Sequence, residues 1–355
     1  GQLGSGQRQD QMALEKMVGL SDAKLYWKLG EEAKDFTKSL IARHAMEAGM
    51  KPGVAWTAST QAGVHHLHDY AAHMLARYDY PEIEIPDAAA FARIIPSPAY
   101  RGGIIDRGAA HLHPLKFALG LARAAAAAGV RIHERSEVHH LAQGSKVTLR
   151  TGAGQVEADH VLLACNGYLG TLDRRIAARV MPINNFIAAT EPLGAEAAKV
   201  LGEDIAVADD KFVVNYYRLS EDGRLLFGGG ESYGYRFPRD IAAKVRRPMC
   251  EIYPHLRDVK IDYAWGGTLA ITMKRLPFFT RIAPNILSAS GYSGHGLGTA
   301  THAGYLMARV LQGQAEGFDA MARLPSIPFP GGAGLRTPFL VAAMSWFALR
   351  DRLGI

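Results

Sequence analysis

The stretch from Asn285 to Leu311 constrains the fold most, because it passes from a strand to a helix through a turn rich in glycine. Its first part, Ile286 to Ala289, is a short apolar run typical of a buried strand. Four glycines follow in the turn: Gly291, Gly294, Gly296 and Gly298. Glycine lets the backbone approach a ligand closely, and the first amides of the following helix carry the positive end of its dipole. The stretch therefore predicts either a structural turn or a binding loop for an anionic group.

The turn departs from the strict dinucleotide-binding pattern, in which glycine or alanine stands three residues after the second glycine. Thr299 occupies this position after Gly296, and no acidic residue follows on a second strand at the expected distance. The turn alone therefore leaves both interpretations open, and the rest of the chain has to decide between them.

Length and composition predict a globular protein large enough for two domains. The chain has 355 residues, of which 48% are hydrophobic and 21% charged. Its formal charge of +6 comes without a dense basic run, which favours anionic small molecules over nucleic acid as partners. Cys165 and Cys250 are too few for a disulfide framework, so we expect a reducing compartment, the cytoplasm.

The two ends of the chain lead to separate expectations. The opening GQLGSGQRQDQ is typical of the middle of a loop and does not begin with methionine, so we expect the chain to be a fragment. A Pro/Gly-rich arm from Leu324 to Leu335 precedes a last helix whose apolar run stops at Arg350. This run is too short to span a bilayer. A packed helix is favoured over attachment to a membrane surface or a partner.

The first part of the chain predicts helices, and the part that follows predicts a helix that leads into a strand, as in an α/β fold. Two amphipathic helices come first, one beginning at the N-cap Ser21 and one covering His65 to Tyr78. A helix framed by Pro114 and Gly129 is followed at once by a predicted strand, Val130 to His133. A helix that leads directly into a strand suits a parallel sheet.

The middle of the chain predicts antiparallel strands. Residues 146–150 and 155–157 alternate about a TGAG turn and predict a small meander, and the apolar run HVLLAC predicts a buried strand. Between Met181 and Thr280, strand-like runs flank Asp222 and Gly223, a hairpin signal. This part is expected to be a second domain inserted into the α/β one.

Histidines gather on the second predicted helix, at His65, His66, His68 and His73. Imidazole is a common metal ligand. The spacing lacks the i, i+4 pair of a zinc-binding helix, and no cysteine or Glu-x-x-His accompanies it. Exposed or capping histidines are therefore favoured, and we predict no metal.

Several segments, taken in order, carry a resemblance to a known family. They are GQLGSGQ, HLHPLKFALGLARAAAAAGVRIHERSEV, DHVLLACNGY, LLFGGGE and SASGYSGHGLGTATHAGYLMA. The chain resembles the FAD-dependent amine and amino-acid oxidoreductases, which include D-amino-acid, glycine and sarcosine oxidases. Within that family it is most similar to the gamma-glutamylputrescine oxidoreductases, including the tail RTPFLVAAMSWFALRDRL. The resemblance covers nearly the whole chain.

The resemblance implies an α/β (mixed α+β) fold. A discontinuous FAD-binding Rossmann-like domain would comprise residues 1–50, 101–180 and 281–323. An antiparallel-sheet substrate domain would comprise 51–100 and 181–280, and 324–355 would form a C-terminal arm and helix. The family opens with a strand, a G-x-G-x-x-G turn and a helix that bind the pyrophosphate, and this chain starts after them. We therefore expect weak FAD binding by the chain as given.

The resemblance also implies which residues bind the cofactor. Segments matching the family's flavin environment are Gln2, Leu3 and Gly4; Glu137 and Val138; Ala164, Cys165, Asn166 and Gly167; and Gly291, Tyr292, Ser293, Gly294, His295, Gly296, Leu297, Gly298 and Thr299. Some relatives tether the flavin through a cysteine near the last motif, but none lies between Trp265 and Pro284. FAD is expected to be held non-covalently.

The implied reaction is oxidation of a primary or secondary amine, as in gamma-glutamylputrescine, to an imine and then an aldehyde. Hydride would pass to the flavin, and oxygen or another acceptor would reoxidise it. Amino-acid oxidases of this family place an arginine shortly after a paired glycine to hold the substrate carboxylate. Here Gly266 and Gly267 are followed by no arginine before Arg275, which favours an amine.

Candidate residues for this chemistry come from the inserted part and the glycine turn. His295 and Tyr217 are predicted to be catalytic, with His295 as a proton relay. Tyr216, Tyr217, Arg218 and Trp265 are predicted to bind the substrate, with Arg218 meeting a carboxylate distant from the amine. Two alternatives stay open: a glycine or D-amino-acid oxidase-like enzyme, and a truncated, non-catalytic fragment.

Overall fold

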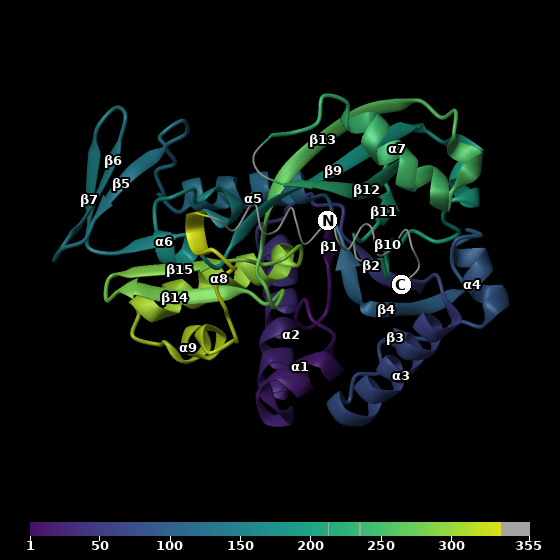
Figure 1. Ribbon diagram of the computed structural model, residues 1–355, viewed down its shortest axis with the longest axis horizontal. Coiled ribbons are helices and arrows are strands. Elements are labelled where there is room, and N and C mark those ends of the chain that lie inside the picture. The colour runs from purple at the N-terminus through teal and green to yellow at the C-terminus, as the bar shows by residue number, and fades with distance from the viewer. Residues whose placement is uncertain (212, 234–235, 335–355) are drawn as a thin grey trace. The chain divides into compact units, whose positions relative to one another are not determined.

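The computed structural model describes residues 1–211, 213–233 and 236–334, and it has a mixed α/β fold (Figure 1). Contacts divide the chain into two compact units. The first unit comprises Gly1–Leu121, Asn184–Ser232 and Arg236–Gly267. The second comprises Ala122–Ile183 and the described residues from Thr268 onward. Each unit has its own sheet system.

A large mixed sheet is the centre of the first unit. Its strands follow the order β1-β4-β2-β10-β11-β12-β9-β13, with β3 paired to β4. The bounds are β1 Gln2–Leu3, β2 Lys51–Ala58, β3 Ile83–Glu84, β4 Gly102–His111, β9 Met181–Pro192, β10 Ala206–Asp209, β11 Tyr216–Leu219, β12 Arg224–Tyr233 and β13 Ile261–Ile271. The predicted antiparallel character is confirmed for β11 with β12 and for β10 with β11.

One face of this sheet carries the main hydrophobic core. Tyr217 and Phe227 are register partners and stack with ring centroids 5.5 Å apart. Helix α7, Ile241–Ile252, packs on this face with Val245 and Met249 fully buried. Because successive side chains of a strand point to opposite faces, the residues that alternate with this core line the other face.

Four helices come from the early part of the chain: α1 Gln11–Val18, α2 Leu20–Arg43, α3 Gln61–Tyr78 and α4 Ala88–Ile94. The two predicted helices are present as α2 and α3, but the prediction of Ser21 as an N-cap is wrong, because Gly19 is the N-cap of α2 and Ser21 lies within the helix. Helix α3 begins at Gln61 and not at His65. Helix α1 was not predicted, because its N-cap, Asp10, stands in a segment with a loop-like composition; the Asp10 side chain accepts a hydrogen bond from the amide of Ala13. Thr60 caps α3 in the same way.

The second unit contains two smaller sheets. The first has the order β14-β15-β8 and the second is the meander β5-β6-β7. Their bounds are β5 Val138–Ala142, β6 Val147–Thr151, β7 Gln155–Ala158, β8 Val161–Leu163, β14 Phe278–Ala283 and β15 Ile286–Ser290. Helices of this part are α5 Pro114–Ala127, which begins in the first unit, α6 Arg174–Ala177, α8 Gly296–Leu311 and α9 Glu316–Ala322; short 3-10 turns are Asn166–Tyr168, Gly194–Lys199 and Pro254–Leu256. The predicted meander, the strand HVLLAC and the helix from Pro114 are confirmed.

The prediction of a strand from Val130 to His133 is wrong. These residues have no regular secondary structure, and Val130 and Ile132 are 55% and 56% exposed. No strand among the described residues pairs with this segment, so nothing satisfies its backbone groups in an extended conformation. The predicted C-terminal helix lies outside the described residues. Within the described part of the chain, no helix has both the length and the apolar character needed to cross a bilayer.

Candidate functional site

The turn between β15 and α8 has the strand-turn-helix geometry that the sequence predicts. All five residues of β15 are buried. Gly291 has φ +74°, and a Cβ added there would lie 2.5 Å from Cγ2 of Thr272. Both the left-handed backbone and the lack of space therefore require glycine at this position.

Hydrogen bonds hold the middle of the turn firmly. The amide of Ser293 donates to the carbonyl of Ala270 at 2.9 Å, and its Oγ accepts from the amide of Thr272 at 3.2 Å. Helix α8 then starts after His295, and no side chain of the described residues caps it. At Gly294 an added Cβ would meet no described atom within 4 Å. The helix start is therefore accessible from the outer side of the turn.

Strand β8 runs parallel to β15, with Ser288 opposite Leu163. The carboxyl ends of both strands therefore lie at the same edge of the sheet. The turn from Ala164 to Gly167 follows β8 at this edge, beside the turn that follows β15. Crevices outside the carboxyl ends of parallel strands are the usual ligand site of open α/β sheets. The structure thus brings two of the predicted cofactor segments together within the second unit.

Two buried polar atoms at this edge lack partners among the described residues. They are Oδ1 of Asn166 and Oγ of Ser290. Asn166 has φ +47°, and Gly167 approaches so closely that an added Cβ would lie 2.9 Å from the carbonyl oxygen of Leu269. Buried polar atoms are nearly always paired in folded proteins. Unpaired buried polar atoms at the carboxyl ends of these strands are therefore suited to bind a polar ligand.

Of the other predicted cofactor residues of this unit, Cys165 has an unreactive thiol, and Glu137 and Val138 lie outside the two turns. Burial raises the pKa of the Cys165 thiol, so the thiol stays protonated and is a poor nucleophile. Glu137 is exposed and Val138 starts β5, in the unit's other sheet. No hydrogen bond within the described residues joins this pair to either turn.

In the first unit, a row of residues crosses the sheet on the face opposite the core. Trp56 on β2 is opposite Ala208 on β10, Ala208 is opposite Tyr216 on β11, and Tyr216 is opposite Gly228 on β12. The Tyr216 ring lies over Gly228, where an added Cβ would overlap it, and its hydroxyl donates to Oδ1 of Asn185. Trp56 is 36% exposed. Trp56 was not predicted, because it follows Val54 and Ala55 in an unbroken apolar run whose sequence does not show which side chain leaves the core.

Arg218 follows Tyr216 by two residues and so shares this face. Its Nη1 donates to the carbonyl of Leu219 at 3.0 Å, the one hydrogen bond its guanidinium makes among the described residues. Burial lowers the pKa of Arg218, while Asp204 and Glu221 act in the opposite direction. A partly desolvated guanidinium with unused donors suits a carboxylate partner.

Tyr217 and Trp265 occupy different environments. Tyr217 is 2% exposed, and its hydroxyl lies 3.2 Å from that of Tyr253 in the core. Trp265 is 43% exposed. The adjacent Gly266 faces the ring of Phe186 in the core, so Trp265 points to the same face as Tyr216. The structure therefore groups Tyr216, Arg218 and Trp265 on one face and places Tyr217 on the other.

The predicted cofactor segment Gln2 to Gly4 also belongs to the first unit. Gln2 and Leu3 form β1 and pair with His111 and Ala110. The side-chain amide of Gln2 donates to the carbonyl of Val207 at 2.8 Å. Leu3 is fully buried. This segment is thus a fixed part of the first unit.

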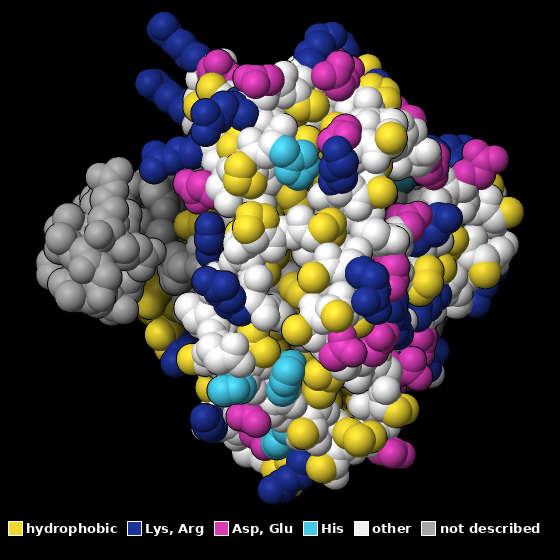
Figure 2. All heavy atoms as spheres, turned by 90° about the vertical axis from the view of Figure 1, so that its right-hand side faces the viewer, with side chains coloured by type: hydrophobic (Ala, Val, Ile, Leu, Met, Phe, Trp, Pro, Cys, Tyr) yellow, Lys and Arg dark blue, Asp and Glu magenta, His cyan; other side chains and the backbone are white. Residues whose placement is uncertain are grey.

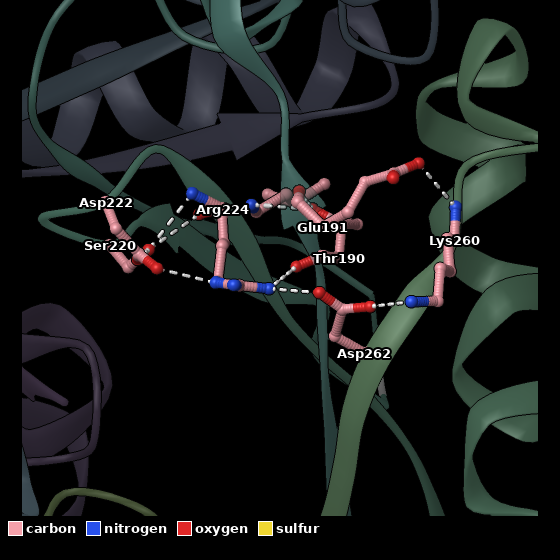
Figure 3. Close-up of polar contacts among 8 residues, drawn as sticks. Thr190, Glu191, Ser220, Asp222, Arg224, Lys260 and Asp262 are labelled. Atoms are coloured by element: carbon pink, nitrogen blue, oxygen red, sulfur yellow. Dashed lines mark hydrogen bonds and ion pairs between the residues drawn. The ribbon is translucent and has the colours of Figure 1, made fainter.

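Charged side chains at the ends of β9, β12 and β13 satisfy one another (Figure 3). The guanidinium of Arg224 contacts the carboxylates of Asp222 and Asp262, each at 2.6 Å, and Lys260 contacts Asp262 at 2.9 Å. The hydrogen bond from Arg224 holds the pKa of Asp262 below its usual value. This network links β9, β12 and β13. Because the guanidinium of Arg224 is already paired with two carboxylates, Arg224 is less suited than Arg218 to bind a carboxylate of a ligand.

Two of the histidines of α3 pair with carboxylates of the α1 region. His73 lies 2.7 Å from Glu15, and His66 lies 3.2 Å from Asp10. Figure 2 shows several histidines low on the viewed face and another near its top, with basic and acidic side chains intermixed over the rest. Across the described residues, no group of three or more His, Cys, Asp or Glu side chains is placed to hold a metal ion.

Comparison with known proteins assigns the family. Residues 1–310 match the family described as FAD dependent oxidoreductase (DAO). The chain is 40% identical over 360 residues to the probable oxidoreductase OrdL of Rhizobium meliloti, covering 99% of this chain and 82% of that protein. It is 37% identical over 358 residues to gamma-glutamylputrescine oxidoreductase of Escherichia coli, covering 100% and 84%. The chain therefore belongs to the DAO family of FAD-dependent oxidoreductases.

Solved structures agree with this assignment at the level of the fold. Glycine oxidase of Geobacillus kaustophilus superposes with a TM-score of 0.71 at 18% identity, covering 88% of this chain and 83% of that one. The protein is accordingly an FAD-dependent oxidoreductase with the mixed α/β fold of this family, as the resemblance implied.

Proposed function

We propose that the protein oxidises a primary or secondary amine of the gamma-glutamylputrescine type. Its 37% identity over 358 residues to the Escherichia coli gamma-glutamylputrescine oxidoreductase carries this proposal. The amine carbon loses a hydride, the resulting imine is hydrolysed, and an aldehyde is released. FAD, when bound, supplies the acceptor for the hydride, and oxygen or another acceptor regenerates it. The enzyme would then serve putrescine catabolism.

The turns after β8 and β15 are the proposed non-covalent FAD site of the second unit. Asn166 Oδ1 and Ser290 Oγ are unpaired among the described residues and suit the polar edge of a flavin. The open start of α8 would place its positive dipole end near developing negative charge. Glu137 and Val138 are proposed for the adenine side, and the segment Gln2 to Gly4 for the ring.

The substrate is proposed to bind on the sheet face that carries Trp56, Tyr216, Arg218 and Trp265. An amine must be neutral to lose a hydride, and aromatic walls favour the neutral form by excluding water. Arg218 would bind a carboxylate far from the amine, as a gamma-glutamyl group provides. This proposal treats residues 51–100 and 181–280 as the substrate domain.

Two further roles complete the proposal. His295 is half-buried at the turn before α8 and is proposed to relay a proton during imine release. Tyr217 lies beneath this face, so its proposed contribution is to position Tyr216 and Arg218 from the core side. The cytoplasm remains the proposed location.

The test is to load the protein with FAD without oxygen and follow the loss of flavin absorbance. Gamma-glutamylputrescine should bleach the flavin, whereas glycine and D-alanine should not. Arg218→Met should raise KM for gamma-glutamylputrescine at least tenfold and leave unsubstituted putrescine unaffected. Arg247→Met, at an exposed arginine of α7, is the matched control and should change neither. Bleaching by glycine or D-alanine alone would replace the amine assignment with an amino-acid oxidase.

A further inference from the structure

An open groove of about 530 Å³ lies within the first unit, and none of Trp56, Tyr216, Arg218 and Trp265 lines it. Helix α2, the start of β2 and the second half of β4 form its walls. It is lined by Glu31, Lys34, Asp35, Lys38, Met50, Lys51, Pro52, Tyr80, Glu82, Arg107, Gly108, Ala109 and Ala110. A volume of this size accommodates a small molecule.

Lys34 is the buried charge of the groove, with its side chain 4% exposed. Its ammonium donates to Glu31 at 2.7 Å and to Ser5 at 2.8 Å, and it lies 3.4 Å from the hydroxyl of Tyr80. Burying a charge is costly unless it is paired, and these contacts satisfy all three ammonium donors. The ammonium of Lys34 therefore has no donor left for a ligand, and other groups of the groove would have to bind one.

Charges of both signs with spare capacity line the rest of the groove. Lys38 donates to the carbonyl of Gly108 at 3.2 Å, which leaves two ammonium donors unused among the described residues. Asp35 and Glu82 line the groove, and their carboxylates have no partner among the described residues. Arg107, in contrast, is held by Glu84 at 2.7 Å and Glu203 at 2.8 Å. Lys51 also lines the groove, and the one contact of its ammonium among the described residues is an exposed ion pair with Asp204 at 3.7 Å. The groups with spare capacity are thus two ammoniums and two carboxylates.

Apolar groups separate the charged positions. Pro52, Ala109 and Ala110 supply an uncharged floor, with Met50 beside them. A small anion would be repelled by Asp35 and Glu82, and a simple cation would be repelled by Lys38 and Lys51. A ligand with an ammonium at one end, a carboxylate at the other and a short apolar chain between them satisfies both signs.

We propose that this groove binds an unbranched ω-amino carboxylate at a site separate from the substrate face. The carboxylate pairs with Lys38, the ammonium pairs with Asp35 or Glu82, and the methylenes lie on the proline and alanine floor. This site is independent of the proposed amine oxidation.

Binding here has a structural consequence for the start of the chain. Glu31 accepts a hydrogen bond from the amide of Gly6 at 3.0 Å, and Lys34 holds the hydroxyl of Ser5. The groove wall thus fixes the residues that follow β1. A ligand that orders this wall slows opening of the Gly6 amide hydrogen bond and hence its exchange with solvent.

The experiment is calorimetric titration of the full chain with 5-aminopentanoate, with pentanoate and pentylamine as single-charge probes. We expect 5-aminopentanoate to bind at least tenfold more tightly than either probe. Lys38→Met and Asp35→Asn should each weaken it at least fivefold. Lys28→Met and Glu32→Gln alter an exposed pair of the same helix, 3.7 Å apart, and should have no effect.

Two further measurements decide the location. Arg218→Met should leave binding of 5-aminopentanoate unchanged, and hydrogen exchange at Gly6 should slow when it binds. Loss of binding in Arg218→Met with normal binding in Lys38→Met would assign the ligand to the substrate face and overturn the proposal. Equal binding of pentanoate, or no binding of 5-aminopentanoate, would also overturn it.

Discussion

Gly228→Ala tests whether the Tyr216 ring rests on the sheet as the structure shows. The added Cβ overlaps the ring, so the ring has to move and its hydroxyl leaves Oδ1 of Asn185. Overpacking costs about 1 to 3 kcal/mol, and loss of the hydrogen bond adds about 1 kcal/mol. The expected fall in the free energy of unfolding is therefore about 2 to 4 kcal/mol.

The assay is urea unfolding followed by tryptophan fluorescence, because Trp27, Trp56 and Trp265 all lie in the first unit. The matched control is Gly304→Ala, the same chemical change inside helix α8, where an added Cβ meets no described atom within 4 Å. Alanine is preferred to glycine in a helix by about 1 kcal/mol. The free energy of unfolding of the control, followed by far-UV circular dichroism, should therefore rise. An unchanged unfolding midpoint for Gly228→Ala would refute the placement of the ring.

Three further predictions concern pH and the cofactor edge. Burial acts to raise the pKa of Glu15, but hydrogen bonds from Tyr78 and His73 hold it below 4.5. Its contribution is present above pH 4.5 and lost below it, so Glu15→Gln should flatten the acid loss of stability in that range. Burial lowers the pKa of His302 from 6.5 to about 4, so stability should fall as pH drops through this window. In His302→Gln this fall should be smaller, as measured by urea unfolding at each pH. Ser290→Ala should leave the FAD-free protein at least as stable, because it removes an unpaired buried hydroxyl, and should weaken FAD in a fluorescence titration; unchanged FAD affinity would argue against this edge as the site.

Local patterns in the sequence were sufficient for the elements whose signals lie within a few residues. The turn after β15 was predictable because its glycines stand between an apolar run and a helix, and Gly291 takes the positive φ expected of it. The hairpin at Asp222 and Gly223 was predictable for the same reason, with Gly223 at φ +74°. In both cases the residues that decide the conformation are neighbours in the chain.

Pairing partners far apart in the sequence were not predictable in the same way. The run from Val130 to His133 has strand propensity, yet a strand forms only when a neighbour satisfies its backbone groups, and none is described beside it. The unpaired atoms of Asn166 and Ser290 were also hidden, because burial and partners are tertiary properties. The family resemblance supplied those two turns, while the geometry supplies the reason that they share an edge.

Tyr216 and Tyr217 show how register decides chemistry. Composition treats them alike, and both are aromatic phenols on one strand, but a shift of one residue exchanges the two faces of a sheet. The partner of Tyr217 is Phe227, which commits it to the core, whereas the partner of Tyr216 is Gly228, which leaves room for its ring to lie flat toward Asn185. Glycine is therefore required at position 228 by the ring of the residue opposite it, Tyr216, and not by the backbone conformation of Gly228 itself. The proposed substrate face of the first unit depends on this pairing. Without the register, the sequence alone therefore cannot say which of the two tyrosines lies on that face.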